Sequence, residues 1–208
     1  FIAGAGVAGL AAIGTAANLG AIVRANDTRA EVADQVVSLG GEFVKVDYEE
    51  EGSGGGGYAK VMSEGFLAAQ REMYARQAKD ADIVITTALI PGRPAPRLIT
   101  SEMVHSMRPG SVIIDLAVER GGNVEGAKPG EIAVVGPAKI VGYLNVPGRL
   151  AASASALYAK NLYTFIETMV DKKEKTLAIN WDDEIIKGTV LTRDGAIVHP
   201  NFMPKTAA

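Results

Sequence analysis

The chain has 208 residues with a formal net charge of −3, so neither a nucleic acid nor an anionic membrane is expected as a direct partner. It contains no cysteine, which excludes disulfides and a thiol nucleophile, and no apolar run approaches the roughly 20 residues that a membrane span requires. A hydrophobic content of 48% with 24 glycines indicates a compact α/β domain with tight turns and some additional elements.

The first thirty residues contain the strongest pattern of the sequence. A short apolar run at 1–3 leads into a Gly-x-Gly-x-x-Gly segment at 4–9, and a helix rich in small residues follows to Leu19. A second apolar run at 21–23 then ends near Asp27. Strand, glycine turn, helix, strand and acidic residue come in the order that a dinucleotide-binding fold requires.

Each glycine of this segment has a physical role in such a fold. Gly4 lets the chain turn sharply after the strand, Gly6 lets a pyrophosphate approach the backbone, and Gly9 lets the helix pack close to the sheet. The free N–H groups at the helix N-terminus then face the phosphates. The alternative is a glycine-rich strand–helix turn that binds no ligand.

Asp27 lies where a carboxylate accepts hydrogen bonds from both hydroxyls of an adenosine ribose. A 2′-phosphate at this place would meet a negative charge, so Asp27 favours NAD over NADP. Arg29, two residues further along the chain, weakens this preference.

The segment that follows contains a helix, a strand and an unusual loop. Residues 28–31 have the spacing of a capping box and predict a helix that ends at 40–41, before a third strand at 42–46. The loop at 47–58 carries three consecutive glutamates and a run of glycines, which is costly to order. It is either a functional segment, with Tyr58 as a latch, or a solvated insertion.

Residues 1–150 are expected to form a Rossmann-type, doubly wound α/β domain with a mainly parallel six-stranded sheet. Helical spacing of apolar residues over 62–73 and a helix capped by Thr100 separate the later strands. The loop at 87–96 leaves the carboxyl end of a strand, where doubly wound folds bind ligands. The expected strands are 1–3, 21–23, 42–46, 82–86, 111–116 and 139–142.

Residues 151–208 do not continue this pattern. An amphipathic helix is expected over 153–170, followed by short strands at 176–181, 185–191 and 196–198, the last preceded by an Asp194-Gly195 hairpin signal. Only three residues precede the first glycine turn, so we expect the chain to be the interior of a longer polypeptide. The C-terminal helix and β tail are then expected to pack on a missing N-terminal subdomain.

Candidates for other chemistry are few. His105 and His199 lack ligand spacing to a second histidine or a cysteine, which argues against zinc. The acidic run 182–184 fits either a hard cation or, more simply, a solvated turn. Glu119 follows a strand where a catalytic group could face a nicotinamide, but a surface carboxylate beside Arg120 is the simpler interpretation.

Several motifs together resemble one family, the NAD(H)-binding domain I of proton-translocating nicotinamide nucleotide transhydrogenases. The resemblance covers nearly the whole chain, and its motifs are specific when taken together. They are the glycine segment through Leu10, Asp27-Thr28-Arg29, Gly56-Gly57-Tyr58-Ala59-Lys60, the Thr86–Pro96 stretch, Pro109–Ala117 and Asn145–Arg149.

The resemblance implies an oxidoreductase and proton translocase. In that family the domain holds NAD(H) and exchanges hydride directly with NADP(H) on a separate domain, while a membrane domain couples the exchange to proton movement. No catalytic side chain is implied, because the protein has to place two nicotinamide rings and exclude water. A homodimer is implied, on the cytoplasmic side of a bacterial inner membrane or on the mitochondrial matrix side.

The resemblance also implies the residues that contact the cofactor. The family positions carried over are Val7, Ala8 and Gly9 at the pyrophosphate, Asp27, Thr28 and Arg29 at the adenosine ribose, Gly57 and Tyr58 in a mobile loop, and Gln70 and Leu89. In the family an N-terminal segment contacts the nicotinamide, and we expect this chain to begin after it.

Two other functions stay open. Alanine dehydrogenases share the Leu-Ile-Pro-Gly loop at 89–92, and in them an Asp stands near the nicotinamide where this chain has Glu119. The residues at 57–60 and 27–29 favour the transhydrogenase. A non-enzymatic nucleotide-binding or docking module is the second alternative.

Overall fold

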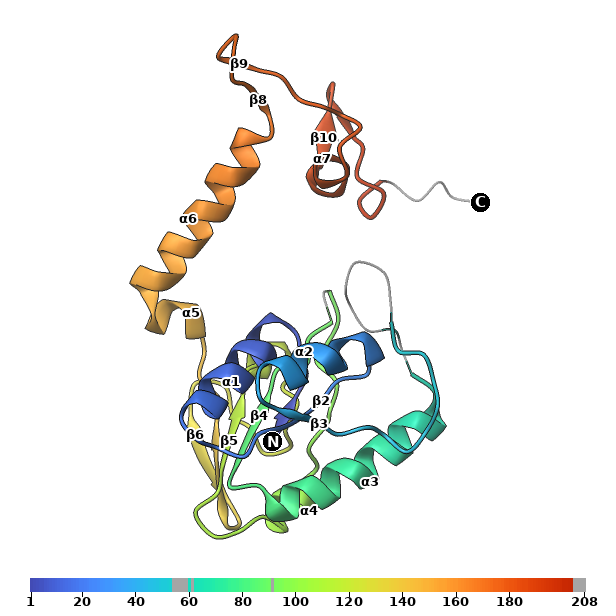
Figure 1. Ribbon diagram of the computed structural model, residues 1–208, viewed down its shortest axis with the longest axis vertical. Coiled ribbons are helices and arrows are strands. Elements are labelled where there is room, and N and C mark those ends of the chain that lie inside the picture. The colour runs from blue at the N-terminus through green and yellow to red at the C-terminus, as the bar shows by residue number, and fades with distance from the viewer. Residues whose placement is uncertain (54–59, 61, 91, 204–208) are drawn as a thin grey trace. The chain divides into compact units, whose positions relative to one another are not determined.

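The computed structural model describes residues 1–53, 60, 62–90 and 92–203. The chain divides into two compact units, Phe1–Val146 and Pro147–Ala208. Each unit is described separately below, and Figure 1 labels their elements. Within the described ranges, no helix is both long enough and apolar enough to cross a membrane.

Unit 1 is built on a seven-stranded sheet with the order β3-β2-β1-β4-β5-β7-β6. All neighbouring strands are parallel except β6 and β7, which are antiparallel. The predicted Rossmann-type, mainly parallel sheet is confirmed. Its strands are β1 (Ile2–Ala3), β2 (Arg24–Asn26), β3 (Glu42–Phe43), β4 (Ile83–Thr86), β5 (Val112–Asp115), β6 (Ile132–Val135) and β7 (Ala138–Val141).

Three details of the predicted sheet were wrong, and one is the third strand, which spans only Glu42–Phe43 and not 42–46. Strand β6 was missed, because it is a sheet edge whose Ile132 and Val134 side chains are exposed, so no buried run marks it. The second strand begins at Arg24 and not at Ala21, because Ile22 points to solvent whereas Ala25 and Asn26 are buried. The apolar run at 21–23 therefore lies directly before this strand and is not part of it.

Helices cover both faces of the sheet, as a doubly wound fold requires (Figure 1). On one face lie α1 (Val7–Asn18) and α2 (Ala33–Ser38), which follows a short 3₁₀ turn at Ala30–Val32. On the other lie α3 (Glu64–Asp80) and α4 (Ser101–His105). Another 3₁₀ turn, Val118–Arg120, follows β5.

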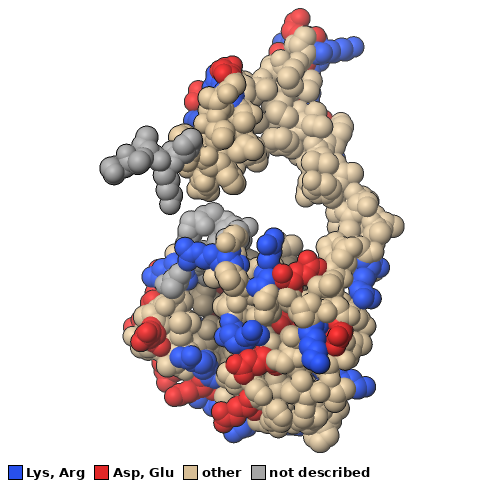
Figure 2. Space-filling view, turned by 180° about the vertical axis from the view of Figure 1, so that it is seen from behind, with Lys and Arg blue, Asp and Glu red and all other residues tan. Residues whose placement is uncertain are grey.

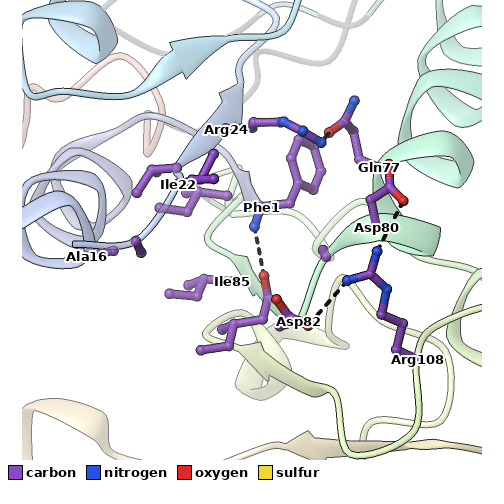
Figure 3. A pocket seen from close by; sticks show the side chains of 14 residues that line it. Phe1, Ala16, Ile22, Arg24, Gln77, Asp80, Asp82, Ile85 and Arg108 are labelled. Carbon is purple, nitrogen blue, oxygen red and sulfur yellow. Dashed lines mark hydrogen bonds and ion pairs between the residues drawn. The ribbon is translucent and has the colours of Figure 1, made fainter. Parts of the chain in front are cut away.

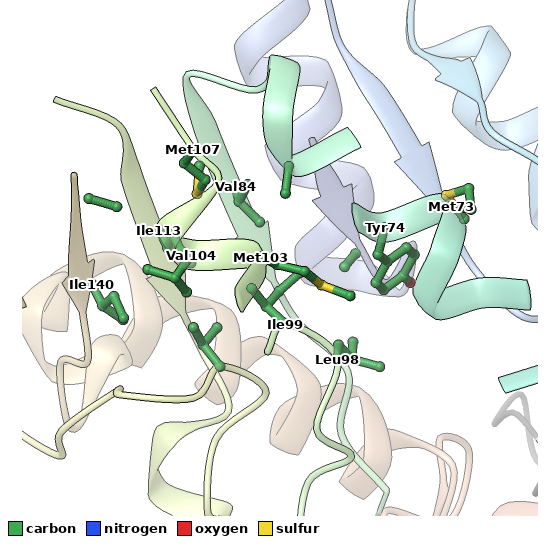
Figure 4. Close-up of a cluster of buried hydrophobic side chains, with 14 residues drawn as sticks. Met73, Tyr74, Val84, Leu98, Ile99, Met103, Val104, Met107, Ile113 and Ile140 are labelled. Carbon is green, nitrogen blue, oxygen red and sulfur yellow. The ribbon is translucent and has the colours of Figure 1, made fainter. Parts of the chain in front are cut away.

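Each face has its own hydrophobic core. Under α3 and α4, methionines and aliphatic side chains surround the β4 and β5 strands, with Met73, Met103 and Ile113 among them (Figure 4). Under α1 and α2, Ile13 and Val36 pack on β1 and β2. These two cores hold the strands in place, so the ends of the strands can carry the residues of a binding site.

Two side chains cap helices of unit 1. Thr100, predicted as a cap, accepts a hydrogen bond from the Met103 N–H at 3.3 Å, and Ser63 does the same for α3. The capping box predicted at 28–31 was wrong, because the chain there forms a 3₁₀ turn whose N-cap, Arg29, makes no side-chain cap bond.

Unit 2 consists of helices and two-residue strands. Helix α5 (Val146–Arg149) lies at the boundary, and α6 (Ala151–Glu167) matches the predicted helix. Two hairpins follow, β8–β9 (Val170–Asp171 with Thr176–Leu177) and β10–β11 (Thr192–Arg193 with Ala196–Ile197). The second turns at Asp194-Gly195, as predicted, with both residues at positive φ.

The strand predicted at 185–191 was wrong, and a helix, α7 (Glu184–Thr189), stands in its place. Its N-cap is Asp183, whose side chain accepts hydrogen bonds from the N–H groups of Ile185 and Ile186 at 2.8 and 3.2 Å. The acidic run 182–184 is therefore a helix start, in which a carboxylate pairs with free N–H groups. The strand predicted at 176–181 is only two residues long.

Candidate functional site

A cavity of about 570 Å³ opens at the carboxyl ends of β1, β2 and β4. Because β1 lies between β2 and β4, this is the place where the strand order reverses and where open α/β sheets bind ligands. The cavity is lined by residues from the glycine turn, the end of β2, helix α3 and the loop after β4.

The glycine turn has the geometry that its sequence predicts. Gly4 adopts a φ of +106°, and a Cβ there would lie 2.5 Å from the Thr87 hydroxyl oxygen. That hydroxyl donates a hydrogen bond of 3.0 Å to the Gly4 carbonyl and so ties the turn to the end of β4. A Cβ on Gly9 would lie 1.9 Å from the same carbonyl, whereas a Cβ on Gly6 would meet nothing within 4 Å.

Helix α1 begins directly at this turn. Gly6 is its N-cap, and among the described residues no side chain caps it and no acidic residue stands in its first turn. The N–H groups of its first turn therefore face outward with the positive end of the helix dipole behind them. This arrangement suits an anion such as a pyrophosphate.

The Asp27 carboxylate, which lines the cavity, accepts several hydrogen bonds. It accepts hydrogen bonds from the Ala5 N–H at 2.8 Å and the Arg29 N–H at 3.0 Å, and from two nitrogens of the Arg29 guanidinium, Nε at 2.9 Å and Nη2 at 3.0 Å. Burial alone would raise the pKa of the Asp27 carboxyl, but these hydrogen bonds outweigh it and hold that pKa below its usual value. Asp27 is thus a carboxylate at neutral pH.

Three buried polar side chains, those of Asn26, Gln70 and Tyr74, line part of the cavity and bond to one another. The Tyr74 hydroxyl and the Gln70 amide nitrogen donate to Asn26 Oδ1 at 2.9 and 3.3 Å, and Asn26 Nδ2 donates to the Val44 carbonyl at 2.7 Å. Burial raises the pKa of Tyr74, so it remains a neutral donor. The sequence analysis missed Asn26 and Tyr74, although an asparagine at the end of an apolar strand was an available signal.

Another residue that was not predicted, Asn123, bonds to the loop after β4. The side chain of Asn123, fully buried, accepts from the Ala88 N–H at 3.1 Å and donates to the carbonyls of Ala88 at 2.9 Å and Pro96 at 2.8 Å. Asp115 in turn accepts from the Val124 N–H at 3.1 Å. These bonds tie Ala88 and Pro96, which both line the cavity, to Asn123.

Most of the predicted site residues come together here. Ala8 and Gly9 lie in the first turn of α1 but do not line the cavity, and Gly57 and Tyr58 lie outside the described residues. Lys60 and the apolar residues Met62, Leu67 and Leu98 line it without having been predicted. The predicted residues that line the cavity are Gly4, Gly6, Val7, Asp27, Thr28, Arg29, Gln70 and Leu89.

The other candidates lie elsewhere. Glu119 is exposed and accepts a hydrogen bond from the Asn145 N–H, so it anchors a turn and does not line the cavity. His105 makes a 2.7 Å hydrogen bond with the Ser101 carbonyl. In the portion of the chain that the structure describes, no three His, Cys, Asp or Glu side chains are grouped so that they could hold a metal ion.

A second cavity, of about 450 Å³, lies at the opposite end of the strands (Figure 3). Its charged side chains are bonded to neighbours that also line it: Arg24 Nη1 donates to the Gln77 side-chain oxygen at 3.2 Å, and Arg108 lies 3.5 Å from Asp80 and 3.7 Å from Asp82. These pairs occupy the groups that would recognise a ligand. The carboxyl-end cavity is therefore the better candidate.

Charges of both signs are mixed over the face of unit 1 that Figure 2 shows, and no large region of that face carries a single sign. This agrees with the small net charge.

Comparison with a family model and with a curated relative gives matches over nearly the whole chain. The model of the family "Alanine dehydrogenase/PNT, C-terminal domain" matches residues 1–200. The chain is 57% identical over 199 residues to the first portion of NAD(P) transhydrogenase subunit alpha of Rhodospirillum rubrum, and the match covers 95% of this chain and 52% of that protein. The chain thus spans about half the length of this curated relative.

A solved structure and a second relative extend the comparison. The crystal structure of a transhydrogenase from Sinorhizobium meliloti has 54% identity and a TM-score of 0.76, covering 95% of this chain and 51% of that one. Alanine dehydrogenase 1 of Staphylococcus aureus is 38% identical over 105 residues, which cover 49% of this chain and 28% of that protein.

Proposed function

Because the chain belongs to the alanine dehydrogenase/PNT C-terminal domain family, we propose that it is the NAD(H)-binding component of a transhydrogenase alpha subunit. In this proposal the chain holds NAD(H), and hydride passes directly to or from NADP(H) on a partner domain. One observation carries it: a single cavity joins the uncapped start of α1, which suits a pyrophosphate, to Asp27, which suits a ribose diol.

The residues of the cavity fit NAD(H) along its length. The first-turn N–H groups of α1 would bind the pyrophosphate, and the Asp27 carboxylate would accept from the ribose hydroxyls. Met62, Leu67 and Leu98 offer an apolar surface to a base. NAD(H) itself supplies the hydride chemistry when bound.

In this proposal the chain contributes to the reaction by holding NAD(H) in position. Asp27 is held by Ala5 and Arg29, and Tyr74 remains protonated at the floor of the cavity, so neither is poised to move a proton. Direct hydride transfer needs no acid or base. It needs the two nicotinamide rings to be held close together and water to be kept out, and Ala88 and Leu89 in the cavity lining would contribute to this.

The proposal includes partners outside this chain. We infer an NADP(H)-binding domain, a membrane domain that couples the exchange to proton movement, and a homodimer of the NAD(H)-binding component. The location would be peripheral, on the cytoplasmic side of a bacterial inner membrane or the matrix side in mitochondria. The name of the Rhodospirillum relative, which numbers it as one portion of an alpha subunit, supports an assembly of several components.

An alanine dehydrogenase is the second candidate. It is disfavoured by Glu119, which anchors the Asn145 turn and does not line the cavity. It is also disfavoured by the sequence identity, which is 57% over 199 residues for the transhydrogenase subunit and 38% over 105 residues for the alanine dehydrogenase. Steady NADH production from L-alanine and NAD⁺ by the protein would reverse this ranking.

The test is a calorimetric titration of the chain with NADH and, in parallel, with NADPH. We expect preferential NADH binding, and we expect Asp27→Ala to weaken it about threefold to tenfold, because a hydrogen bond contributes a net of about 0.5–1.5 kcal/mol. Asp34→Ala, an exposed carboxylate on α2 outside the cavity, is the matched control. Equal or tighter binding of NADPH would overturn the assignment.

Activity requires the partner. Mixed with a separate NADP(H)-binding domain, the NAD(H)-binding component should support hydride transfer between the two bound nucleotides. If it binds NADH but never transfers hydride with any such partner, it is a docking or storage module and does not belong to an enzyme.

A further inference from the structure

We propose that the Arg29 guanidinium is an internal competitor for the ribose-binding carboxylate of Asp27, and that the Asp27–Arg29 pair sets the choice between a 2′-hydroxyl and a 2′-phosphate. This inference rests on the proposed NAD(H) function. It concerns what must happen inside the cavity before a nucleotide can bind there.

The acceptor capacity of Asp27 is the first step. A carboxylate has two oxygens with about four lone-pair positions in total. Oδ1 accepts from the main-chain N–H and the Nε of Arg29, and Oδ2 accepts from the Ala5 N–H and from Arg29 Nη2. Protein donors thus fill all four positions, and a ribose diol can bond to Asp27 only if some of these donors leave.

Only two of the four donors are able to leave. The Ala5 N–H belongs to the glycine turn, where Ala5 is 1% exposed, and the Arg29 N–H belongs to the turn that enters the 3₁₀ segment. Moving either would disrupt the backbone. The guanidinium is on a flexible stem, so Nε and Nη2 are the donors that a ribose can replace.

The Arg29 guanidinium and a ribose diol can each donate two hydrogen bonds to the Asp27 carboxylate. Arg29 presents two parallel N–H donors to the two carboxylate oxygens, in a side-chain pair whose members are 15% and 9% exposed. A vicinal diol presents two O–H donors to the same oxygens. Ribose binding therefore exchanges one donor pair for another and gains less free energy than it would at an unpaired carboxylate.

A 2′-phosphate meets a different situation. It has acceptors where the diol has donors, so it cannot replace the guanidinium on Asp27, and it places a second anion beside the first. A guanidinium released from Asp27 would, however, bind a phosphate well, because its fork matches phosphate oxygens. Asp27 thus excludes NADP(H) twice, by its own charge and by holding Arg29.

The test measures NADH and NADPH affinity for two single variants and their combination. Arg29→Ala should bind NADH about tenfold more tightly than the natural sequence, with NADPH still excluded, because the competitor is gone and the carboxylate remains. Asp27→Asn should weaken NADH and strengthen NADPH, because Arg29 is released. The combination of both changes should lose that gain in NADPH affinity.

A matched control and a second readout keep the test decisive. Arg24→Ala removes another arginine that pairs with a carboxylate, Glu42 at 3.6 Å, but outside this cavity, and should leave both affinities unchanged. If Arg29→Ala does not fold, Arg29→Lys keeps the charge without the fork and should still tighten NADH by about threefold. In the natural sequence, the Arg29 Nε–H signal in NMR spectra should lose its protection from exchange when NADH is added.

The outcomes separate the two proposals. If the natural sequence binds no NADH, the proposed function fails. If it binds NADH but Arg29→Ala or Arg29→Lys binds it equally or more weakly, Arg29 is a ligand of the ribose and the competition is disproved. A protected Arg29 Nε–H in the presence of saturating NADH also disproves it.

Discussion

The two units of the chain place their apolar side chains in opposite ways. In unit 1, Ile113 and Ile140 are fully buried between the sheet and its helices. In unit 2, Leu150 and Leu157 are both 70% exposed, and Ile186 is the one buried residue among those described there. Unit 1 has a core, whereas unit 2 has secondary structure and almost no core.

The difference shows that helices and hairpins, which form between nearby residues, have a different cause from a sheet that joins distant segments. Helix α6 and the two hairpins of unit 2 satisfy their backbone groups within a few residues, so alanine-rich sequence and turn chemistry are enough to form them. The sheet of unit 1 pairs strands from distant segments of the chain and requires burial. An apolar face such as that of α6 marks an interaction surface. We propose that it covers another region of a longer polypeptide.

The largest expected effect contrasts two isoleucines. Ile113→Ala should lower the free energy of unfolding by about 2–5 kcal/mol, because it removes packed atoms and leaves a cavity. Ile166→Ala on α6, where the side chain is 54% exposed, should change it by less than about 0.5 kcal/mol. Urea denaturation of the chain measures both. Equal losses would show that α6 is covered in solution and would end the contrast.

A smaller effect contrasts two helical glycines. Gly9→Ala in α1 should cost about 2–3 kcal/mol and impair nucleotide binding, because its Cβ would lie 1.9 Å from the Gly4 carbonyl oxygen. Gly188→Ala in α7 meets nothing within 4 Å and should stabilise that helix by about 0.5–1 kcal/mol. Thermal unfolding followed by circular dichroism gives the sign of each change. Destabilisation at Gly188 would show that unit 2 packs more closely than proposed.

The smallest effect contrasts two carboxylates whose pKa values both lie below normal. For Asp27, hydrogen bonds outweigh burial, and for Asp171 the N–H groups of Glu174 and Lys173 lower the pKa at an exposed site. A lowered folded-state pKa gives stability above the unfolded value, about 3.9, and this stability is lost as the pH falls through the folded value.

Asp27→Asn should therefore cost about 1–2 kcal/mol at pH 7, and this cost should shrink as the pH falls through the lowered pKa of Asp27. Asp171→Asn should show a smaller dependence on pH, because water screens that carboxylate. The measurement is urea denaturation of each variant and of the natural sequence at pH 7 and at a series of lower pH values. A loss for Asp27→Asn that is independent of pH would mean that its charge contributes nothing.

Much of unit 1 followed from the sequence. The glycine spacing predicted the turn before α1, and buried runs predicted β4 and β5 nearly to the residue. Edge strand β6 did not follow, because its exposed face carries no hydrophobic pattern that distinguishes it. Helix α7 was mistaken for a strand, because Ile185 and Ile186 have high strand propensity, and the capping carboxylate of Asp183 decided the outcome.

The sequence by itself determined the fold class, the position of the glycine turn and the identity of the acidic residue at the end of β2. These depend on backbone sterics and on neighbours within a few residues. Only the tertiary structure decided that Asn26, Tyr74 and Asn123 support the cavity, because their partners lie from 18 to 48 residues away. It also decided that Arg29 and Ala5 together fill the acceptor positions of Asp27, because hydrogen-bond saturation depends on geometry that residue spacing does not specify.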